Sequence, residues 1–169
     1  IARQMLPNHG LAAVPAMIIG LINHPDIGKS KIKSIKGIFC GSAPLAVGTL
    51  EKFEELSGGR IVEGAGMSET INIYTVNPVR TKRKVGSCGI IWPDTDLVVV
   101  DVETGRKVMG RNEEGELIGR GPQFIKEYWN NKEETDKAVI DGWLYTGDIV
   151  KIDEEGFVYI LDRKKDMII

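Results

Sequence analysis

The chain has 169 residues, 42% of them hydrophobic and 27% charged, and its formal net charge is −2. This composition is typical of globular proteins and excludes a largely disordered chain, while the even mixture of 22 basic and 24 acidic residues excludes the extended basic surface that binds nucleic acid. The two cysteines, Cys40 and Cys88, are too few for a disulfide scaffold and lie at no metal-ligand spacing, so we expect a cytoplasmic protein.

The first element that the sequence predicts is a helix over residues 14–23. Apolar residues recur there at helical spacing, and Pro15 fits a first turn, where its missing N–H costs nothing. The surrounding apolar stretch, residues 11–22, is too short to cross a bilayer, so no transmembrane segment is expected. Because the chain starts at Ile1 and ends in the apolar run of residues 166–169, we expect an internal fragment of a longer protein.

A strand, a helix and a second strand are predicted next. The apolar run 34–40 leads into the turn 41–44, which is typical of a strand end that turns into a helix. Pro44 would open that helix, Gly58 and Gly59 would close it, and residues 60–63 would form the second strand. A helix between two strands favours parallel pairing, so residues 1–80 are predicted to be the end of an α/β subdomain.

The remainder of the chain consists of short β-type runs separated by Gly, Pro, Asp and Glu turns. The runs span residues 85–89, 96–102, 116–120, 149–153 and 157–161. This pattern predicts a small β-barrel or a twisted antiparallel lobe over residues 81–162. One short helix is expected from Asn131 to about residue 139, because Asn131 and Glu134 have the spacing of a capping box.

Glycine-containing turns follow both strands of the first unit, at residues 41–44 and 64–70. Ligands of α/β sheets bind at the carboxyl ends of the strands, so the two turns are expected to form one cleft. Glycine lets the backbone approach a ligand closely, Ser68 offers a hydroxyl to a phosphate, and Glu69 offers a hard oxygen ligand to Mg²⁺. For each turn taken by itself, a tight connection between strand and helix is the simpler interpretation.

The runs 149–153 and 157–161 flank the turn 153–156 and predict a β-hairpin. Residues whose numbers sum to about 309 would lie opposite each other, so Asp148 would face Leu161, beside Asp162 and Arg163. A carboxylate there can accept hydrogen bonds from two vicinal hydroxyls, and a guanidinium can donate to the same sugar or to a phosphate. From the hairpin alone, a salt bridge that closes its end is an equally good interpretation.

Four segments, in this order, favour a ligand site. They are 41–45 (GSAPL), 63–70 (EGAGMSET), 141–148 (DGWLYTGD) and 162–166 (DRKKD). Together they resemble the adenylate-forming superfamily of acyl-CoA synthetases, coumarate-CoA ligases, luciferases and peptide-synthetase adenylation domains. Segment 141–148 is the most specific, the resemblance extends from about residue 14 to Ile169, and the stretches 121–123 and 128–131 are similar to the acyl-CoA and aryl-CoA ligase branch.

The resemblance implies a two-step reaction, in which a carboxylate attacks the α-phosphate of Mg·ATP to give an acyl-adenylate and pyrophosphate, and coenzyme A then displaces AMP. It also implies roles by matching position. These are Ser42 and Ala43 along the adenine, Glu63 and Gly64 near the adenine and the acyl pocket, Ser68 at the phosphate, Glu69 as the Mg²⁺ ligand, Asp148 at both ribose hydroxyls with Arg163 assisting, and Lys165 at the hinge of a small C-terminal domain. Ser68 and Glu69 are the residues expected to take part in catalysis.

This sequence departs from the family pattern at Ala65, where an aromatic residue usually stacks on the adenine. Losing that platform is expected to cost about 1 to 3 kcal/mol unless another group replaces it. The family's phosphate loop and the catalytic lysine of its C-terminal domain have no counterpart in the chain, and residues 163–169 would only begin that domain. The chain alone is therefore expected to make no acyl-adenylate.

The favoured interpretation is part of a ligase for a fatty acid or another apolar acid, because Ile18, Met67 and Val76 suggest an apolar lining of the acid pocket. Apolar residues near a cleft are more often ordinary core, so two alternatives stay open. One is an aryl-acid or luciferase-like adenylate-forming enzyme, and the other is a non-catalytic nucleotide-binding module. The partners expected for the complete enzyme are the small carboxylic acid, ATP and coenzyme A.

Overall fold

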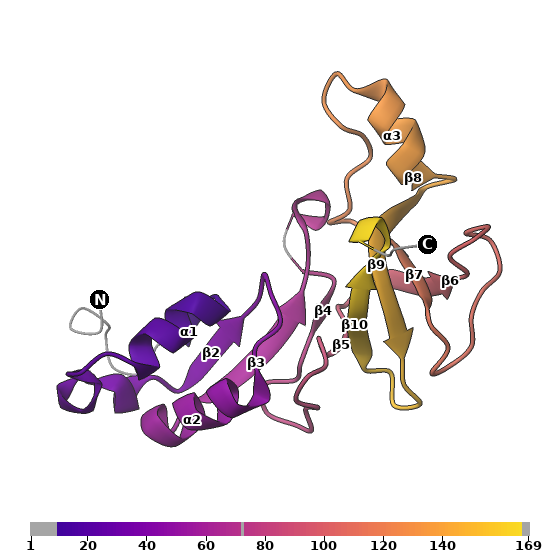
Figure 1. Ribbon diagram of the computed structural model, residues 1–169. Coiled ribbons are helices and arrows are strands. Elements are labelled where there is room, and N and C mark those ends of the chain that lie inside the picture. The colour runs from indigo at the N-terminus through magenta and orange to yellow at the C-terminus, as the bar shows by residue number, and fades with distance from the viewer. Residues whose placement is uncertain (1–9, 72, 167–169) are drawn as a thin grey trace.

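The computed structural model describes residues 10–71 and 73–166, which form two five-stranded sheets. Figure 1 shows the first sheet with its two helices at one side of the molecule and the second sheet, with one projecting helix, at the other. The first sheet is mixed and the second is antiparallel throughout. The predicted fold class, an α/β lobe followed by a twisted antiparallel lobe, is confirmed.

Three parallel strands form one side of the first sheet: β1 (Gly10–Ala13), β2 (Gly37–Cys40) and β3 (Arg60–Ala65). Helix α1 (Pro15–Ile22) follows β1, and α2 (Val47–Ser57) connects β2 to β3, which confirms the parallel unit. Two antiparallel strands, β4 (Thr75–Val76) and β5 (Ile90–Ile91), extend the sheet beyond β3. The boundary predicted at residue 80 thus lies within this sheet, and the division into subdomains remains a prediction.

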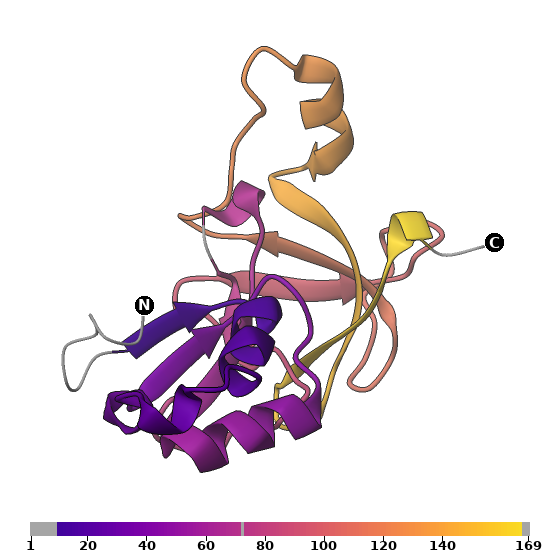
Figure 2. The same ribbon diagram turned by 60° about the vertical axis from the view of Figure 1, so that its left-hand side comes forward.

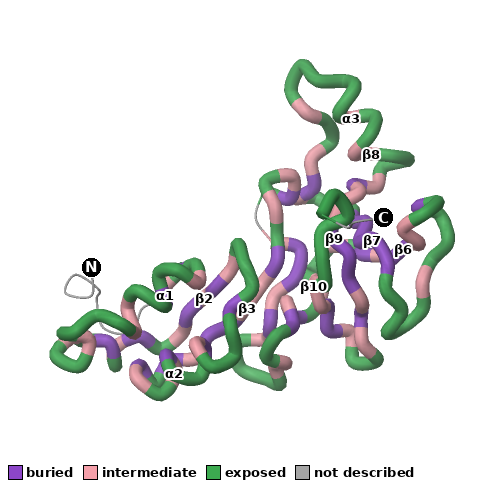
Figure 3. The backbone as a smooth tube through the Cα atoms, viewed as in Figure 1, coloured by how far each residue is buried: buried purple, intermediate pink, exposed green. Residues whose placement is uncertain are grey.

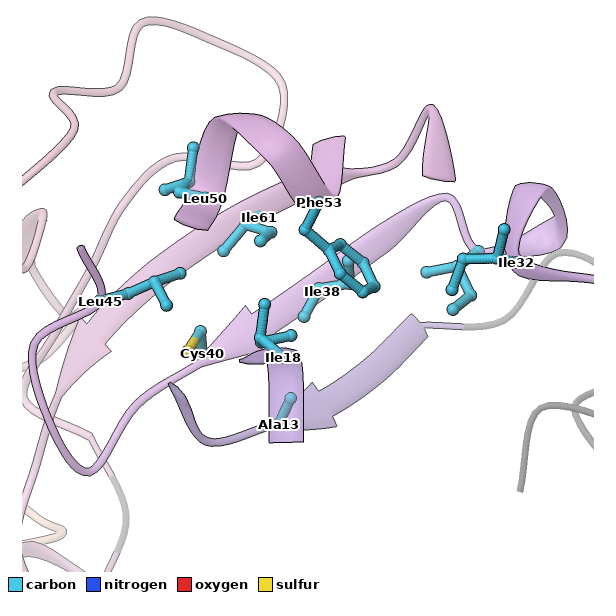
Figure 4. Close-up of a cluster of buried hydrophobic side chains, with 10 residues drawn as sticks. Ala13, Ile18, Ile32, Ile38, Cys40, Leu45, Leu50, Phe53 and Ile61 are labelled. Atoms are coloured by element: carbon cyan, nitrogen blue, oxygen red, sulfur yellow. The ribbon is translucent and has the colours of Figure 1, made fainter. Parts of the chain in front are cut away.

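Both helices pack on one face of the parallel strands. Ile18 of α1 and Phe53 of α2 share a buried cluster with Ile38 and Ile61, and each of these residues is at most 1% exposed (Figure 4). Fully burying an apolar side chain of this size contributes about 1.5–3 kcal/mol. Because side chains alternate along a strand, Phe39, which follows Ile38 in β2, points to the opposite face of the sheet.

One predicted helix start and one predicted strand were wrong. Helix α2 begins at Val47 rather than at Pro44, because Leu45 is buried in the core and Ala46 keeps an extended conformation. Residues 85–89 form a turn and not a strand, since Gly86 and Gly89 adopt φ angles of 83° and 89°. The end of α2 was predicted correctly, at Gly58 in the left-handed conformation.

Single 3-10 turns complete the irregular segments. They are η1 (Ile27–Lys29), η2 (Ile32–Ser34), η3 (Ser68–Thr70) and η4 (Lys164–Asp166). Among residues 10–71 and 73–166, no helix is both long and apolar enough to cross a membrane.

The second sheet contains β6 (Asp96–Val100), β7 (Gly115–Arg120), β9 (Trp143–Ile152) and β10 (Val158–Arg163), with the short β8 (Val139–Ile140) paired to the start of β9. Figure 2 shows the twist that carries the long strand β9 across this lobe. The β8–β9 connection is Asp141–Gly142, with φ angles of 52° and 80°, as a type I′ hairpin turn requires.

Helix α3 (Lys132–Ala138) projects from the second lobe and buries none of its residues (Figure 3). The amide of Glu134 donates to the Asn131 side chain at 3.2 Å, which confirms the predicted cap. The carboxylate of Glu134 pairs with Lys137 instead of the Asn131 amide, so only half of the expected capping box forms.

Candidate nucleotide site

A cleft of about 310 Å³ lies at the carboxyl ends of the three parallel strands. Val14 follows β1, Gly41 and Ser42 follow β2, and Gly64 and Gly66 lie at the end of β3, and all of them line it. This is the edge at which α/β sheets bind ligands. The structure therefore brings the two predicted glycine turns together in one cleft.

At Gly64 the cleft exposes backbone because a side chain would have no room there. Gly64 lies within β3, not in the turn that was predicted to start at this residue. A Cβ at Gly64 would lie 2.8 Å from the Phe39 ring and from the Thr75 carbonyl oxygen. Ser42, which is exposed, adopts a φ of 73°, a left-handed conformation that costs an L-residue about 1–2 kcal/mol.

The remaining residues predicted along the adenine occupy the same region. Ala43 is exposed beside Ser42, although it does not belong to the cleft lining. Glu63 is half-buried and lies opposite Cys40 in the β2–β3 ladder, and burial raises the pKa of its carboxyl. Burial also raises the pKa of the Cys40 thiol to about 11, so this cysteine is not a ready nucleophile.

The apolar lining of the cleft differs from the one predicted. Ile18 is completely buried in the helix-covered core, and neither Met67 nor Val76 is among the described residues that line the cleft. Met17, Phe39 and Ile73 line it instead, together with Val14. Ile18 was mispredicted because helical periodicity identifies which residues share a face, but not which neighbouring residue reaches past the sheet edge.

Asp148 and Arg163 meet at the end of the β9–β10 ladder. Arg163 lies directly opposite Asp148, and its Nε atom is 2.7 Å from Asp148 Oδ1. The predicted register was wrong by two residues. Val158 already pairs with Ile152, one residue away from the predicted register, and an irregularity between Ile160 and Asp162, which leaves Leu161 unpaired, shifts the pairing by one more. The side chains of Asp148 and Arg163 nevertheless meet, as predicted.

Burial changes the pKa and the hydrogen bonding of the Asp148 carboxylate. Its side chain is 3% exposed, whereas that of Arg163 is 48% exposed. Burial raises the pKa of Asp148, against the hydrogen bond from Tyr74 and the charge of Arg163, while the nearby Glu116 carboxylate also raises it. The Oδ1 atom is buried without a hydrogen-bond donor of suitable geometry among the described residues, despite the close ion pair.

An unsatisfied buried carboxylate oxygen is uncommon in native proteins, and a ligand hydroxyl is one group that would satisfy it. Oδ2, by contrast, accepts a 2.8 Å hydrogen bond from the hydroxyl of Tyr74. Tyr74 is 1% exposed, and its backbone N–H donates to the carbonyl of Ala65. Its ring occupies the core beside Ala65 and presents no open face on which an adenine ring would stack.

A bulge in β9 sets the position of Asp148. Three residues of β9, Thr146, Gly147 and Asp148, lie opposite the single residue Leu117 of β7. Gly147 adopts a φ of 72°, and Thr146 Oγ1 donates to the Leu117 carbonyl while accepting from the Asp148 amide. The Thr-Gly-Asp sequence thus provides both the backbone conformation and the hydrogen bonds of the bulge.

The segment that follows β3 contains Ser68 and Glu69 in η3. Ser68 is exposed, and the half-buried Glu69 accepts a 2.8 Å hydrogen bond from the hydroxyl of Tyr128 on Oε1. The residues that the structure describes contain no cluster of three or more His, Cys, Asp or Glu that could hold a metal. Proteins usually bind Mg²⁺ through one or two carboxylates together with substrate phosphates, so a single Glu69 fits that mode of binding.

The segment after Arg163 carries the predicted hinge. Lys164 Nζ lies 2.7 Å from Oε2 of the buried Glu116, while Lys165 is exposed in η4. Tyr74, Tyr128 and Glu116 were not predicted from the sequence. The sequence gives no signal for them: the strand of Glu116 reads GELIGR, in which only Leu117 and Ile118 are large and apolar, and the tyrosines belong to none of the four segments that carry the resemblance.

A second hollow, of about 550 Å³, lies on another part of the surface. Its lining includes Glu54 and Arg83, which form an ion pair at 2.6 Å. Because these charges are paired with each other, we assign no ligand to this hollow.

Comparison with known proteins identifies relatives of the chain. The chain is 47% identical over 155 residues to a long-chain-fatty-acid–CoA ligase of Bacillus subtilis, covering 92% of this chain and 28% of the relative. It is 36% identical over 163 residues to the long-chain-fatty-acid–CoA ligase of Yersinia pestis, covering 96% and 29%.

Solved structures of related proteins align with most of the chain. An ATP-bound RpMatB-BxBclM chimera aligns with a TM-score of 0.86 at 35% identity, over 95% of this chain and 32% of that one. The O-succinylbenzoate coenzyme A synthetase of Bacillus subtilis, in complex with ATP and magnesium ion, aligns with a TM-score of 0.79 at 30% identity, over 95% and 32%. The chain thus spans about a third or less of these proteins. Residues 5–129 match the family described as AMP-binding enzyme, and the chain belongs to that family.

Proposed function

We propose that this chain forms part of a ligase that activates a long-chain fatty acid with ATP and transfers the acyl group to coenzyme A. The observation that carries the proposal is the buried Oδ1 of Asp148, which receives no hydrogen bond of suitable geometry from the described residues, although Arg163 Nε lies 2.7 Å away. A ribose hydroxyl supplies the missing donor. The names of the two curated relatives support the fatty acid and coenzyme A as substrates.

The nucleotide would extend from the cleft to the Asp148 pair. Ser42, Ala43, Glu63 and Gly64 would lie along the adenine, where exposed backbone allows close approach of a flat ring. Asp148 would accept a hydrogen bond from the ribose, and Arg163 would hold the carboxylate in its ionised form. Tyr74 bridges the two parts, because its amide binds Ala65 and its hydroxyl binds Asp148.

The phosphates would lie over η3. The Ser68 hydroxyl would contact a phosphate oxygen, and Glu69 would provide the protein ligand of Mg²⁺, whose charge would stabilise the reacting phosphate. Tyr128 fixes the Glu69 carboxylate through a 2.8 Å hydrogen bond. Lys165, exposed beyond Arg163, would be the hinge of a C-terminal domain.

The acid would occupy the apolar side of the cleft. Met17, Phe39 and Ile73 line that side, and a hydrocarbon chain is the class of substrate that such a surface favours. Such an enzyme would work in the cytoplasm, where ATP and coenzyme A are available.

A chimera tests the proposal. The 155 aligned residues of the Bacillus subtilis relative would be replaced by the matching segment of this chain. We expect pyrophosphate release that depends on palmitate and on ATP, with formation of palmitoyl-CoA. The Asp148→Asn chimera should lose about 10- to 100-fold in kcat/KM for ATP, because a hydrogen bond to a charged group is worth about 1.5–3 kcal/mol.

The controls separate the alternatives. Preference of the chimera for 4-coumarate over palmitate would replace the fatty acid by an aryl acid. Acid-independent nucleotide binding without any pyrophosphate release by a folded chimera would favour a non-catalytic module. The isolated 169-residue chain should release no pyrophosphate, because much of the electrostatic stabilisation of the reacting phosphate would come from parts of the relatives that it does not span.

A further inference from the structure

Glu116 is a buried carboxylate at a position where the proposed chemistry does not use one. It lies on β7 with its side chain only 4% exposed, in register with Ile149 of β9. Charged groups are rarely buried unless they are paired, because removing a carboxylate from water is costly. Both oxygens of Glu116 are paired: Oε1 accepts from the Gly147 amide at 3.2 Å, and Oε2 lies 2.7 Å from Lys164 Nζ.

The two partners of Glu116 are the chain neighbours of the two ribose-site residues. Gly147 immediately precedes Asp148, and Lys164 immediately follows Arg163. Gly147 lies in the β9 bulge, where its amide has left the regular ladder, and Glu116 accepts the hydrogen bond that the ladder would otherwise provide. Lys164 lies just past the last paired residue of β10.

We infer that Glu116 is a positioning residue, which holds Asp148 and Arg163 in the arrangement that binds the ribose. It would touch neither nucleotide nor acid. It acts on the Asp148 side through the Gly147 amide and on the Arg163 side through the Lys164 ammonium, so one carboxylate fixes both strands at their irregular ends. The inference rests on the proposed function, since it assigns a role to the ribose site.

The charge of Glu116 contributes to this arrangement through the ion pair with Lys164. Its carboxylate lies close enough to raise the pKa of Asp148, so the site holds two carboxylates together with two cations, Arg163 and Lys164. Removing the charge of Glu116 would release Lys164 while sparing the hydrogen bond to Gly147, because an amide oxygen can still accept it. Glu116→Gln therefore separates the ion pair from the backbone contact.

The test compares AMP with 2′-deoxyAMP as ligands of the 169-residue chain, by titrations followed by NMR. The native chain should bind AMP about tenfold more tightly, since only AMP offers the second ribose hydroxyl. In Glu116→Gln the ratio should fall to about two- or threefold, while the affinity for 2′-deoxyAMP changes little. Lys164→Met should have the same effect, the double variant should lose no more than either single one, and Lys164→Arg should keep most of the ratio.

Glu103→Gln is the matched control, because Glu103 is an exposed carboxylate in the same lobe and should keep the tenfold ratio. A Glu116→Gln chain that weakens both ligands by one factor, with the ratio unchanged, would show a merely structural role and overturn the inference. The inference is equally overturned if Lys164→Met, a change at a half-exposed residue, leaves the ratio at its native value. A native chain that does not distinguish the ligands would instead refute the ribose contact of the proposed function, and the role of Glu116 with it.

Discussion

The cleft and the Asp148 pair present binding groups in opposite ways. At the cleft, Gly41, Gly64 and Gly66 leave backbone uncovered at the ends of regular parallel strands. At the Asp148 pair, charged side chains lie in an antiparallel ladder that is interrupted in both β9 and β10. The first arrangement follows from topology, whereas the second depends on bulges that shift individual residues out of register.

The two regions differ accordingly in what they tolerate. The cleft should be sensitive to an atom added at Gly64, where a Cβ would lie 2.8 Å from the Phe39 ring. The Asp148 pair should be sensitive to the loss of single polar atoms, because Asp148 is 3% exposed and each of its contacts is specific. Substitutions that add one carbon or remove one oxygen therefore test the comparison directly.

The largest effect on stability is expected from Gly64→Ala. The added Cβ would lie 2.8 Å from the Thr75 carbonyl oxygen, so the backbone of β3 or β4 must shift. We expect a loss of about 1–3 kcal/mol in the free energy of unfolding, measured by urea denaturation. Gly48→Ala is the control, since nothing lies within 4 Å of its Cβ and alanine favours a helix by about 1 kcal/mol. Equal effects of the two substitutions would contradict the close packing at Gly64.

A smaller effect is expected from Tyr74→Phe, which removes one oxygen and leaves the ring in place. Asp148 Oδ2 would lose the 2.8 Å hydrogen bond, and the chain should lose about 1–2 kcal/mol in the free energy of unfolding. Tyr159→Phe provides the comparison, because its hydroxyl makes only a 3.4 Å contact with Asp153 nearer the surface. If both variants unfold at the same urea concentration as the native chain, the hydroxyl of Tyr74 contributes nothing to the fold.

The smallest effect concerns pH. The pKa of Asp148 is raised chiefly by burial, so the stability that it contributes is fully present below the ordinary Asp pKa of about 3.9. That contribution is lost as the pH rises through the raised pKa. The free energy of unfolding of Asp148→Asn, relative to that of the native chain, should therefore increase with pH above about 4. A difference that stays constant between about pH 3 and pH 7 would contradict the raised pKa.

Much of the fold follows from local patterns in the sequence. The apolar run ending at Cys40 and the glycine at 58 predict the parallel strand–helix–strand unit, and the turn at residues 153–156 predicts the hairpin that brings Asp148 to Arg163. These predictions succeed because periodicity and turn chemistry act over a few residues. The register at Leu161 and the turn at Gly89 were mispredicted, because a bulge and a left-handed glycine depend on packing against another strand.

The contacts around Asp148 show the limit of sequence reasoning most clearly. Tyr74 and Asp148 are 74 residues apart in the chain, and Glu116 is 48 residues from Lys164. No periodicity relates such distant positions, so only the folded arrangement reveals these pairs. The bulge at the Thr-Gly-Asp run, by contrast, depends on neighbouring residues. A glycine adopts the left-handed conformation, and a hydroxyl two residues before the buried carboxylate accepts from the Asp148 amide.

The hydrogen bond from Tyr74 to Asp148 has a consequence for how the lobes open. Tyr74 directly precedes β4 of the first sheet, whereas Asp148 belongs to β9 of the second, so this contact joins the two sheets. Local opening of one sheet would break it and expose Asp148 to water. A nucleotide held by Asp148 would oppose that opening, so its binding should slow amide hydrogen exchange in β3 and β9 together, as in one cooperative unit.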